Sequence, residues 1–486
     1  MPAGSLVAGV DSSTQATKVV IVDPDSGRLL AQGQARHTVS GTGGARETDP
    51  REWWSALRAA LAETGRAAEV GAISIAGQQH GLVVLDGHGE PLRPATLWND
   101  TRSAEDAERL TSRLGAESWA RLTGLRPVAS FTVCKWAWLR RTEPELARIV
   151  AAVRLPHDYL TERLTGRGTT DRGDASGTGW WSPTSGGYLD EILSLPDVDV
   201  AAELLPAVLG PTDPAGAVTA AAASDLGLAA GTVVGPGTGD NAGAALGLGL
   251  AVGQAAMSLG TSGTIFAVSA RSTADPTGIV AGFADATGHF LPLAATLNCT
   301  VAVDRVASWL GLDRDDVAPA GSVVMLPYLD GERTPNLPLA SGTISGLRHT
   351  STPQQILMAA YEGAVASLLM AFDAIGEAVG GLDAAAPLVL IGGGARGRTW
   401  RSVVGRLTGR PILVPEAAES VAMGAAVQAA AVLRGEELAD VTRRWSAARG
   451  LGGILLDPVP LDEERLSRIR AALARQVAEQ RQPAAG

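Results

Sequence analysis

The sequence contains few cysteines and few lysines. Its two cysteines, Cys134 and Cys299, belong to no CxxC or Cys/His pattern, which excludes a disulfide framework and a zinc site of the usual ligand spacing. Lys18 and Lys135 are the only lysines among 40 basic residues, and 51 acidic residues give the chain a net charge of −11. Since no basic cluster stands out, we do not expect nucleic acid as a partner.

Long uninterrupted apolar runs are also missing. No basic segment precedes the first apolar run, so we expect no signal peptide. The segment 241–270 has no charge and is long enough to cross a bilayer at ~20 residues per crossing. Six glycines and several polar residues interrupt it, whereas membrane insertion requires sustained apolar character. We therefore expect no membrane partner, and the two isolated cysteines fit a reducing, cytoplasmic location.

Length and composition indicate an ordinary globular protein with more than one domain. At ~150 residues per domain, the 486 residues correspond to about three domain equivalents. The chain is 45% hydrophobic and 19% charged, which is far from the composition of disordered proteins. We therefore expect large buried cores.

Short strands in close succession begin the chain. Three β-prone runs, 6–10, 18–22 and 29–35, are separated by a polar loop and a turn, which predicts antiparallel hairpins. A buried strand is predicted at 72–76. Between them a helix is predicted to begin at Asp49-Pro50, and its apolar face carries Trp53, Trp54, Leu57 and Leu61.

The second half repeats this opening in outline. Two apolar strands, 255–259 and 264–268, flank a Gly- and Ser/Thr-rich turn, and 290–294 is a candidate third strand. The patterns that follow predict helices and strands in alternation: a helix at 356–379, strands at 388–391 and 412–414, and a small-residue helix at 421–433. Two halves that each begin with strand, polar turn and strand indicate a duplicated α/β domain with a cleft between the copies.

No P-loop motif occurs in the chain, so any phosphate must be held in another way. The two Ser/Thr-rich turns, 11–15 and 260–264, offer backbone N–H groups and hydroxyls that suit a polyphosphate. Each turn is equally consistent with a plain hairpin connection. Both interpretations stay open at this point.

A glycine-rich turn at 392–397 matches GxGxxG, follows a strand and precedes a helix. With Glu416 farther on, this spacing is typical of a dinucleotide site. Such a fingerprint usually begins a longer series of βαβ units, and fewer than a hundred residues remain here. A simple glycine turn and a nucleotide-facing turn are the other options.

Two further motifs carry polar side chains among small residues. Asp240 lies in the glycine-rich segment 237–243, where a carboxylate is either a turn former or a general base that faces a bound hydroxyl. Gln78, Gln79 and His80 follow the predicted strand at 72–76. A single histidine in such a place is more often structural than functional.

The order of these motifs resembles that of the FGGY carbohydrate kinases. The resemblance covers residues 7–433. The motifs that carry it are 77–81, 97–100 with Arg102, 135–139, 155–160, 239–241, 260–264, 326–335 and 392–396.

This resemblance implies an α/β fold with two ribonuclease-H-like domains, as in actin-like ATPases, around a central cleft. The N-terminal domain, 1–246, would bind the sugar, and the C-terminal domain, 247–486, would bind the nucleotide. Asp240 would be the catalytic base, and Asp11 would assist it by holding Mg²⁺. The sugar would contact Gln79, His80, Trp98 and Asn241, and ATP would contact Ser13, Thr14, Lys18, Gly260, Thr261, Ser262, Gly393, Gly394 and Ala395.

The expected substrates are therefore ATP and a small sugar, with D-xylulose phosphorylated at its 5-hydroxyl. Ribulose, glycerol or gluconate as the acceptor, and an actin-like ATP-binding regulatory module, are the alternatives. A homodimer is allowed by the resemblance but not required.

The chain departs from the family pattern at three positions. The first phosphate turn reads Ser12-Ser13-Thr14 where glycine is usual, Gln79 stands where methionine is frequent, and His157 stands where lysine is common. An amide at position 79 replaces an apolar wall with hydrogen-bonding groups, which bears on sugar preference. None of the three changes the predicted base.

Overall fold

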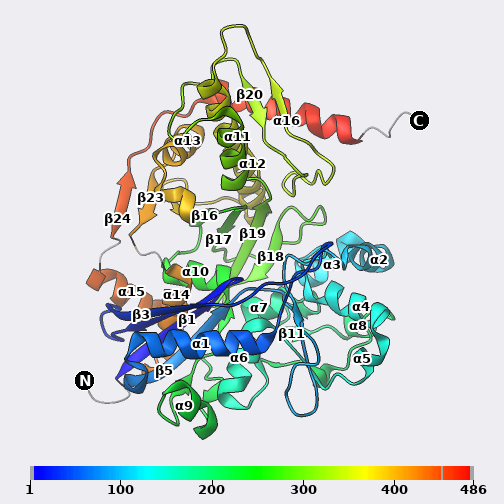
Figure 1. Ribbon diagram of the computed structural model, residues 1–486, viewed down its shortest axis with the longest axis vertical. Coiled ribbons are helices and arrows are strands. Elements are labelled where there is room, and N and C mark those ends of the chain that lie inside the picture. The colour runs from blue at the N-terminus through cyan, green and yellow to red at the C-terminus, as the bar shows by residue number, and fades with distance from the viewer. Residues whose placement is uncertain (1–4, 417–418, 450–451, 482–486) are drawn as a thin grey trace. The chain divides into compact units, whose positions relative to one another are not determined.

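The computed structural model describes residues 5–416, 419–449 and 452–481 (Figure 1). The chain forms two compact units that are not contiguous in sequence. Unit 1 comprises Met1–Leu250, Ser269–Leu291 and Glu419–Leu451, and unit 2 comprises Ala251–Val268, Pro292–Ala418 and Gly452–Gly486. The single predicted boundary, between residues 246 and 247, lies near Leu250, where the first segment of unit 1 ends. The prediction places the two later segments of unit 1 in the C-terminal domain.

A mixed sheet forms the centre of unit 1. Its main path is β13-β14-β5-β1-β2-β3, in which β1, β2 and β3 are antiparallel and β5 runs parallel to both β1 and β14 (Figure 1). The predicted hairpins and the strand at 72–76 are therefore confirmed. The strands are β1 (Leu6–Ser12), β2 (Ala16–Val22), β3 (Leu29–Arg36), β5 (Val70–Gly77), β13 (Gly216–Ala217) and β14 (Val233–Val234).

Helices cover both faces of this sheet. α1 (Pro50–Thr64) begins where predicted, with the Asp49 side chain accepting the Arg51 N–H, and buries its apolar face in the same core as Ala8 and Val10. Alternate strand residues point to opposite faces, so Gly9 faces the other way. There a Cβ would lie 1.9 Å from the Ala422 carbonyl oxygen, because α14 (Ser420–Arg434) packs directly on the strand.

Unit 2 repeats the same pattern of strand directions, but its outer strand follows its neighbour in sequence, whereas the outer strand of unit 1 precedes its neighbour. Its strands follow the order β19-β17-β16-β22-β23-β24, with β16 antiparallel to β17, β17 antiparallel to β19, and β22 parallel to both β16 and β23. In unit 1 the outer strand β13 is antiparallel to β14, and in unit 2 the outer strand β24 is antiparallel to β23. The strands are β16 (Ala255–Leu259), β17 (Gly263–Ala267), β19 (Phe290–Thr296), β22 (Leu388–Ile391), β23 (Ile412–Pro415) and β24 (Gly453–Leu456).

The core helix of unit 2 is α12 (Pro353–Val379), which begins with a capping box between Thr352 and Gln355. In the described part of the chain, α12 is the one helix long and apolar enough to cross a membrane, and 72% of its most apolar stretch is buried inside the protein. The charge-free segment 241–270 instead forms most of α10 (Asp240–Gly247) followed by β16 and β17. The predicted α/β fold with two related sheets is thus confirmed.

Candidate active site

The turn between β1 and β2 presents the first group of predicted site residues. Asp11 is the second-last residue of β1 and is 5% exposed. The Ser13 hydroxyl donates to Asp11 Oδ1 over 2.6 Å, and the Ser13 N–H donates to the Ala16 carbonyl to close the turn. The Ser13 hydroxyl therefore orients the Asp11 carboxylate.

Asp240 lies in the first turn of α10, is half-buried, and interacts electrostatically with Asp11. Its Oδ1 atom accepts two hydrogen bonds of 2.8 Å, from the Asn241 backbone N–H and from Asn241 Nδ2. Asn241 Nδ2 also donates to Gln79 Oε1 over 3.0 Å. The predicted base and two predicted sugar contacts thus form one hydrogen-bonded set.

Both carboxyl groups have raised pKa values. Burial raises the pKa of Asp11 to about 6, although Ser13 and Lys18 partly oppose it. Burial raises the pKa of Asp240 to about 7, and the charges of Asp11 and Asp174 add to the effect. A carboxylate with a pKa near neutrality is well suited to accept a proton from a hydroxyl.

His80 follows Gln79 in a left-handed backbone conformation, with φ of 66°, which is uncommon outside glycine. Its ring centroid lies 5.1 Å from that of Phe131, edge-on, and 5.3 Å from that of Phe283. A Cβ on Gly177 would meet the imidazole at 2.4 Å. The predicted sugar contact therefore stands in a tight aromatic enclosure.

Trp98 and Lys18 connect the β1–β2 turn with other segments. Trp98, 36% exposed, donates its indole N–H to Thr14 Oγ1 over 3.0 Å, so a predicted sugar contact touches a predicted phosphate contact. Lys18 Nζ lies 2.8 Å from Glu419 Oε2, just before α14. The predicted nucleotide contact is thus engaged in an ion pair.

In unit 2 the predicted nucleotide contacts lie on two adjacent turns. β16 and β22 are parallel, so the turns that follow them, 260–262 and 392–395, meet at the same edge of the sheet. A Cβ on Gly394 would lie 2.8 Å from the Leu259 Cβ and 3.0 Å from Thr300 Cγ2. Thr300 in turn donates its N–H and its hydroxyl to the Gly260 carbonyl, over 3.0 and 2.8 Å.

These turns expose backbone rather than charge. Gly392 has φ of 84°, and Gly393 has nothing within 4 Å of its would-be Cβ, whereas Gly394 and Ala395 are buried. Thr261 is exposed and Ser262 half-buried at the tip of the other turn. The turn at 392 continues into a short 3-10 helix, Gly393–Arg396, and then α13 (Arg398–Thr408).

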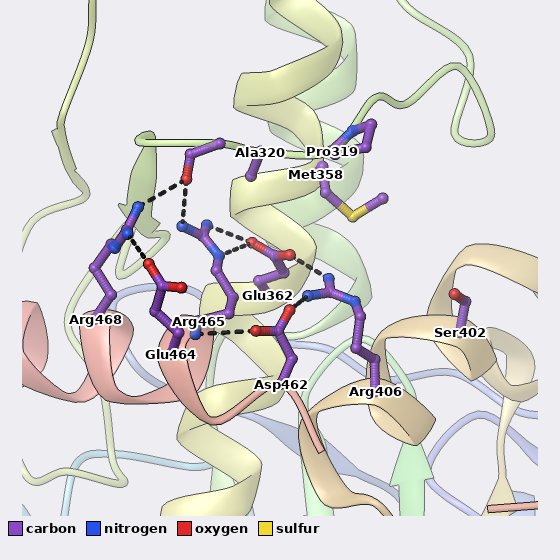
Figure 2. A pocket seen from close by; sticks show the side chains of 11 residues that line it. Pro319, Ala320, Met358, Glu362, Ser402, Arg406, Asp462, Glu464, Arg465 and Arg468 are labelled. Atoms are coloured by element: carbon purple, nitrogen blue, oxygen red, sulfur yellow. Dashed lines mark hydrogen bonds and ion pairs between the residues drawn. The ribbon is translucent and has the colours of Figure 1, made fainter. Parts of the chain in front are cut away.

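A separate hollow of about 560 Å³ lies among the helices of unit 2 (Figure 2). It is lined by charged residues that pair with one another. Glu362 of α12 binds Arg406 of α13 and Arg465 of α16 (Glu463–Arg481), and Arg406 also binds Asp462. None of the predicted site residues lines it, and its paired charges join the C-terminal helix to α12 and α13.

Sequence analysis missed several side chains that support the site. Asp171 and Asp174 lie buried beside His157, and Glu332 accepts hydrogen bonds from the backbone N–H groups of Leu297 and Asn298, just before α11 (Thr300–Leu310). Glu332 lies inside the motif at 326–335 that carries the family resemblance, so the sequence did mark this residue as a candidate for the site. Asp171 and Asp174 lie in none of the quoted motifs.

Two family models match the chain. The N-terminal domain of the FGGY family of carbohydrate kinases matches residues 6–247, and the C-terminal domain of that family matches residues 255–433. The chain is 60% identical over 474 residues to the xylulose kinase of Streptomyces coelicolor, covering 97% of this chain and 96% of the relative.

More distant relatives that match the chain are also named xylulose kinase. The xylulose kinase of Escherichia coli is 34% identical over 424 residues, covering 83% of this chain and 85% of the relative. The crystal structure of xylulose kinase from Bifidobacterium adolescentis superposes with a TM-score of 0.84 at 36% identity, covering 96% of this chain and 99% of that one.

Proposed function

The chain belongs to the FGGY family of carbohydrate kinases, and we propose that it transfers the γ-phosphoryl group of ATP to the 5-hydroxyl of D-xylulose. Relatives named xylulose kinase match nearly the full length of the chain. The family has the two-domain actin-like fold, with which the repeated sheet topology of the two units agrees.

The observation that carries the proposal is the half-buried carboxylate of Asp240, held by the Asn241 N–H and amide. Phosphoryl transfer needs in-line positioning, stabilisation of charge and a carboxylate that orients the attacking hydroxyl. Asp240 accepts the proton of the 5-hydroxyl, and Gln79, Asn241 and His80 bind the sugar. The pKa of Asp240, raised to about 7, keeps a useful share of the base form at neutral pH.

The two turns of unit 2 bind the nucleotide phosphates through backbone N–H groups and hydroxyls. The exposed backbone at Gly393 allows a ligand to approach closely. Thr261 and Ser262 offer hydroxyls to the γ-phosphate. In this reading the GxGxxG match serves ATP and not a dinucleotide.

The residues at Asp11 suit Mg²⁺ as the cofactor. Within the described residues, no group of three or more His, Cys, Asp or Glu side chains is arranged to hold a metal. Mg²⁺ usually binds through one or two carboxylates together with substrate phosphates and water, a need that the Asp11 carboxylate meets. When bound, the ion neutralises charge on the phosphates.

The test is ADP release measured with D-xylulose, D-ribulose, glycerol and gluconate as acceptors. We expect the highest kcat/KM with D-xylulose. A higher value with glycerol or gluconate would contradict the assigned substrate. Equal ADP release with and without any acceptor would instead support an actin-like ATPase module and contradict the kinase.

A further inference from the structure

A cluster of buried charges lies at the N-terminal end of α6 (Pro156–Thr165). The Nε2 atom of His157 is 3.3 Å from Asp158 Oδ1, 3.3 Å from Asp171 Oδ1 and 3.2 Å from Asp174 Oδ2. All four side chains are buried, with exposures of 0% for His157, Asp158 and Asp174. Three carboxyl groups from three elements therefore converge on one imidazole nitrogen.

This geometry favours the charged form of the imidazole. Buried carboxylates are costly unless a cation compensates them, and a neutral imidazole supplies no charge. Burial alone would lower the pKa of His157, but the three aspartates together raise it well above its ordinary value. Burial raises the pKa of Asp158, and it raises that of Asp174 to about 7.

The other ionisable groups near the cluster either bind partners outside it or lie at its edge. Arg154, at the end of β8 (Ala152–Arg154), binds Glu162 over 2.6 Å and acts on Asp158. Tyr188 faces Asp158 but donates its hydroxyl to the Pro206 carbonyl. Asp240 faces Asp174 from α10. Among the described residues, His157 is therefore the one basic side chain that lies within 3.3 Å of all three aspartates.

The cluster supports the segment that leads into Asp240. A Cβ on Gly237 would lie 2.6 Å from His157 Nδ1, and one on Gly77 would lie 3.1 Å from His157 Cβ. The Thr238 hydroxyl donates to Asp171 Oδ2 over 3.2 Å. Thr238 and Gly239 form β15, which pairs with the end of β5, and Asp240 follows at once.

We propose that His157 is a positioning residue that holds a positive charge among Asp158, Asp171 and Asp174 and thereby fixes the backbone that carries Asp240. Only the expected effect of His157 on the phosphorylation rate rests on the proposed kinase function. Loss of the charge leaves the three carboxyl groups either repelling one another or protonated. Either change displaces β15 and with it the base.

The first test is independent of catalysis. The full-length protein is labelled with ¹³C at the histidine ring, and its six histidines are titrated by NMR, with His157→Gln identifying the signal of His157. We expect this signal to stay in the imidazolium form well above pH 7. A neutral His157 at pH 7 would overturn the proposal, even if the kinase assignment holds.

The second test separates a charge requirement from a packing requirement. His157→Lys keeps a cation, and His157→Gln keeps a polar side chain without one. We expect kcat on D-xylulose to fall roughly ten- to a hundred-fold in His157→Gln, the scale of a displaced catalytic group, with KM for ATP nearly unchanged and kcat largely retained in His157→Lys. His88→Gln, which changes an exposed histidine, is the control and should match the wild type.

The double variant His157→Gln/Asp174→Asn keeps the proposal testable if the single variant His157→Gln does not fold. Because it removes one carboxylate together with the cation, it should melt at a higher temperature than His157→Gln. Equal kcat in the Lys and Gln variants, or no gain in the double variant, would overturn the proposal. Absence of sugar-dependent ADP release from the wild type would contradict the kinase assignment instead and leave the NMR result valid.

Discussion

The two units share a pattern of strand directions but differ in the side chains at the ends of their central strands. Asp11 is the second-last residue of β1, and Ser258 holds the same place in β16. Unit 1 adds Asp240, whose charge interacts with that of Asp11, whereas the turns of unit 2 consist of glycine, alanine and hydroxyl residues. The two related sheets therefore carry different chemical groups at corresponding strand ends, and in the proposed function unit 1 supplies carboxylates and unit 2 supplies backbone donors.

The largest expected effect comes from removing the proposed base, Asp240. Asp240→Asn keeps the shape of the side chain but cannot accept the hydroxyl proton, so the phosphorylation rate should fall roughly 10²–10⁴-fold. ATP affinity, measured by calorimetry, should stay close to that of the wild type. If Asp240 merely shapes its turn, the variant will instead lose melting temperature without a selective loss of rate.

The pH dependence of the rate tests the coupling between the two carboxylates. Asp240 must be deprotonated to act, and its pKa is about 7, so kcat/KM should rise through pH 7 and fall toward tenfold per pH unit below it. Asp11→Asn removes a charge that raises this pKa, so the acid limb should move to lower pH.

Ser258→Ala, at the matching place in unit 2, provides the control for this measurement and should leave the acid limb where it is in the wild type. An acid limb that stays in place in Asp11→Asn would show that the two carboxylates do not interact. The contrast between the units would then rest on Asp240 alone.

A backbone change in unit 2 should act on the nucleotide and not on the sugar. Gly392 has φ of 84°, and a Cβ there would lie 2.8 Å from the Leu259 carbonyl oxygen. Left-handed backbone costs an L-residue ~1–2 kcal/mol, so Gly392→Ala should weaken ATP binding by about tenfold, with D-xylulose affinity preserved. Calorimetric titration with each ligand measures both.

Gly376→Ala is the matched control in the same unit. Gly376 lies within α12 and has nothing within 4 Å of its would-be Cβ, so alanine should raise the melting temperature through helix propensity and leave ATP affinity unchanged. Equal ATP affinity in Gly392→Ala and Gly376→Ala would remove the nucleotide role assigned to the turn at 392.

The smallest expected effect is at the contact between Trp98 and Thr14. Trp98→Phe removes the 3.0 Å hydrogen bond from the indole to Thr14 Oγ1, and Trp98 is partly exposed, so the cost should be about 0.5–1.5 kcal/mol. KM should rise a few-fold, for D-xylulose more than for ATP. A larger rise for ATP would reassign Trp98 to the phosphate turn.

Local patterns in the sequence predicted the strands and helices well. Short β-prone runs, a buried apolar run and an Asp-Pro start located β1, β2, β3, β5 and α1, because these elements depend on neighbouring residues. The site residues came from the family resemblance, since the residues alone left Asp240 open between a turn former and a base.

Contacts between distant parts of the sequence could not be predicted. Lys18 pairs with Glu419, and α14 packs on Gly9 from the C-terminal part of the chain. Asp171 and Asp174 look unremarkable along the sequence, and only folding buries them beside His157. Such burial depends on the whole tertiary structure and leaves no local periodicity.

The most direct test of the account is the identity of the product formed from ATP and D-xylulose, determined by ³¹P and ¹³C NMR for the wild type and Asp240→Asn side by side. The account predicts a phosphate ester at carbon 5 from the wild type and a strongly slowed yield of the same ester from the variant. Inorganic phosphate as the main product, an ester at another carbon, or equal rates from the two proteins would contradict it.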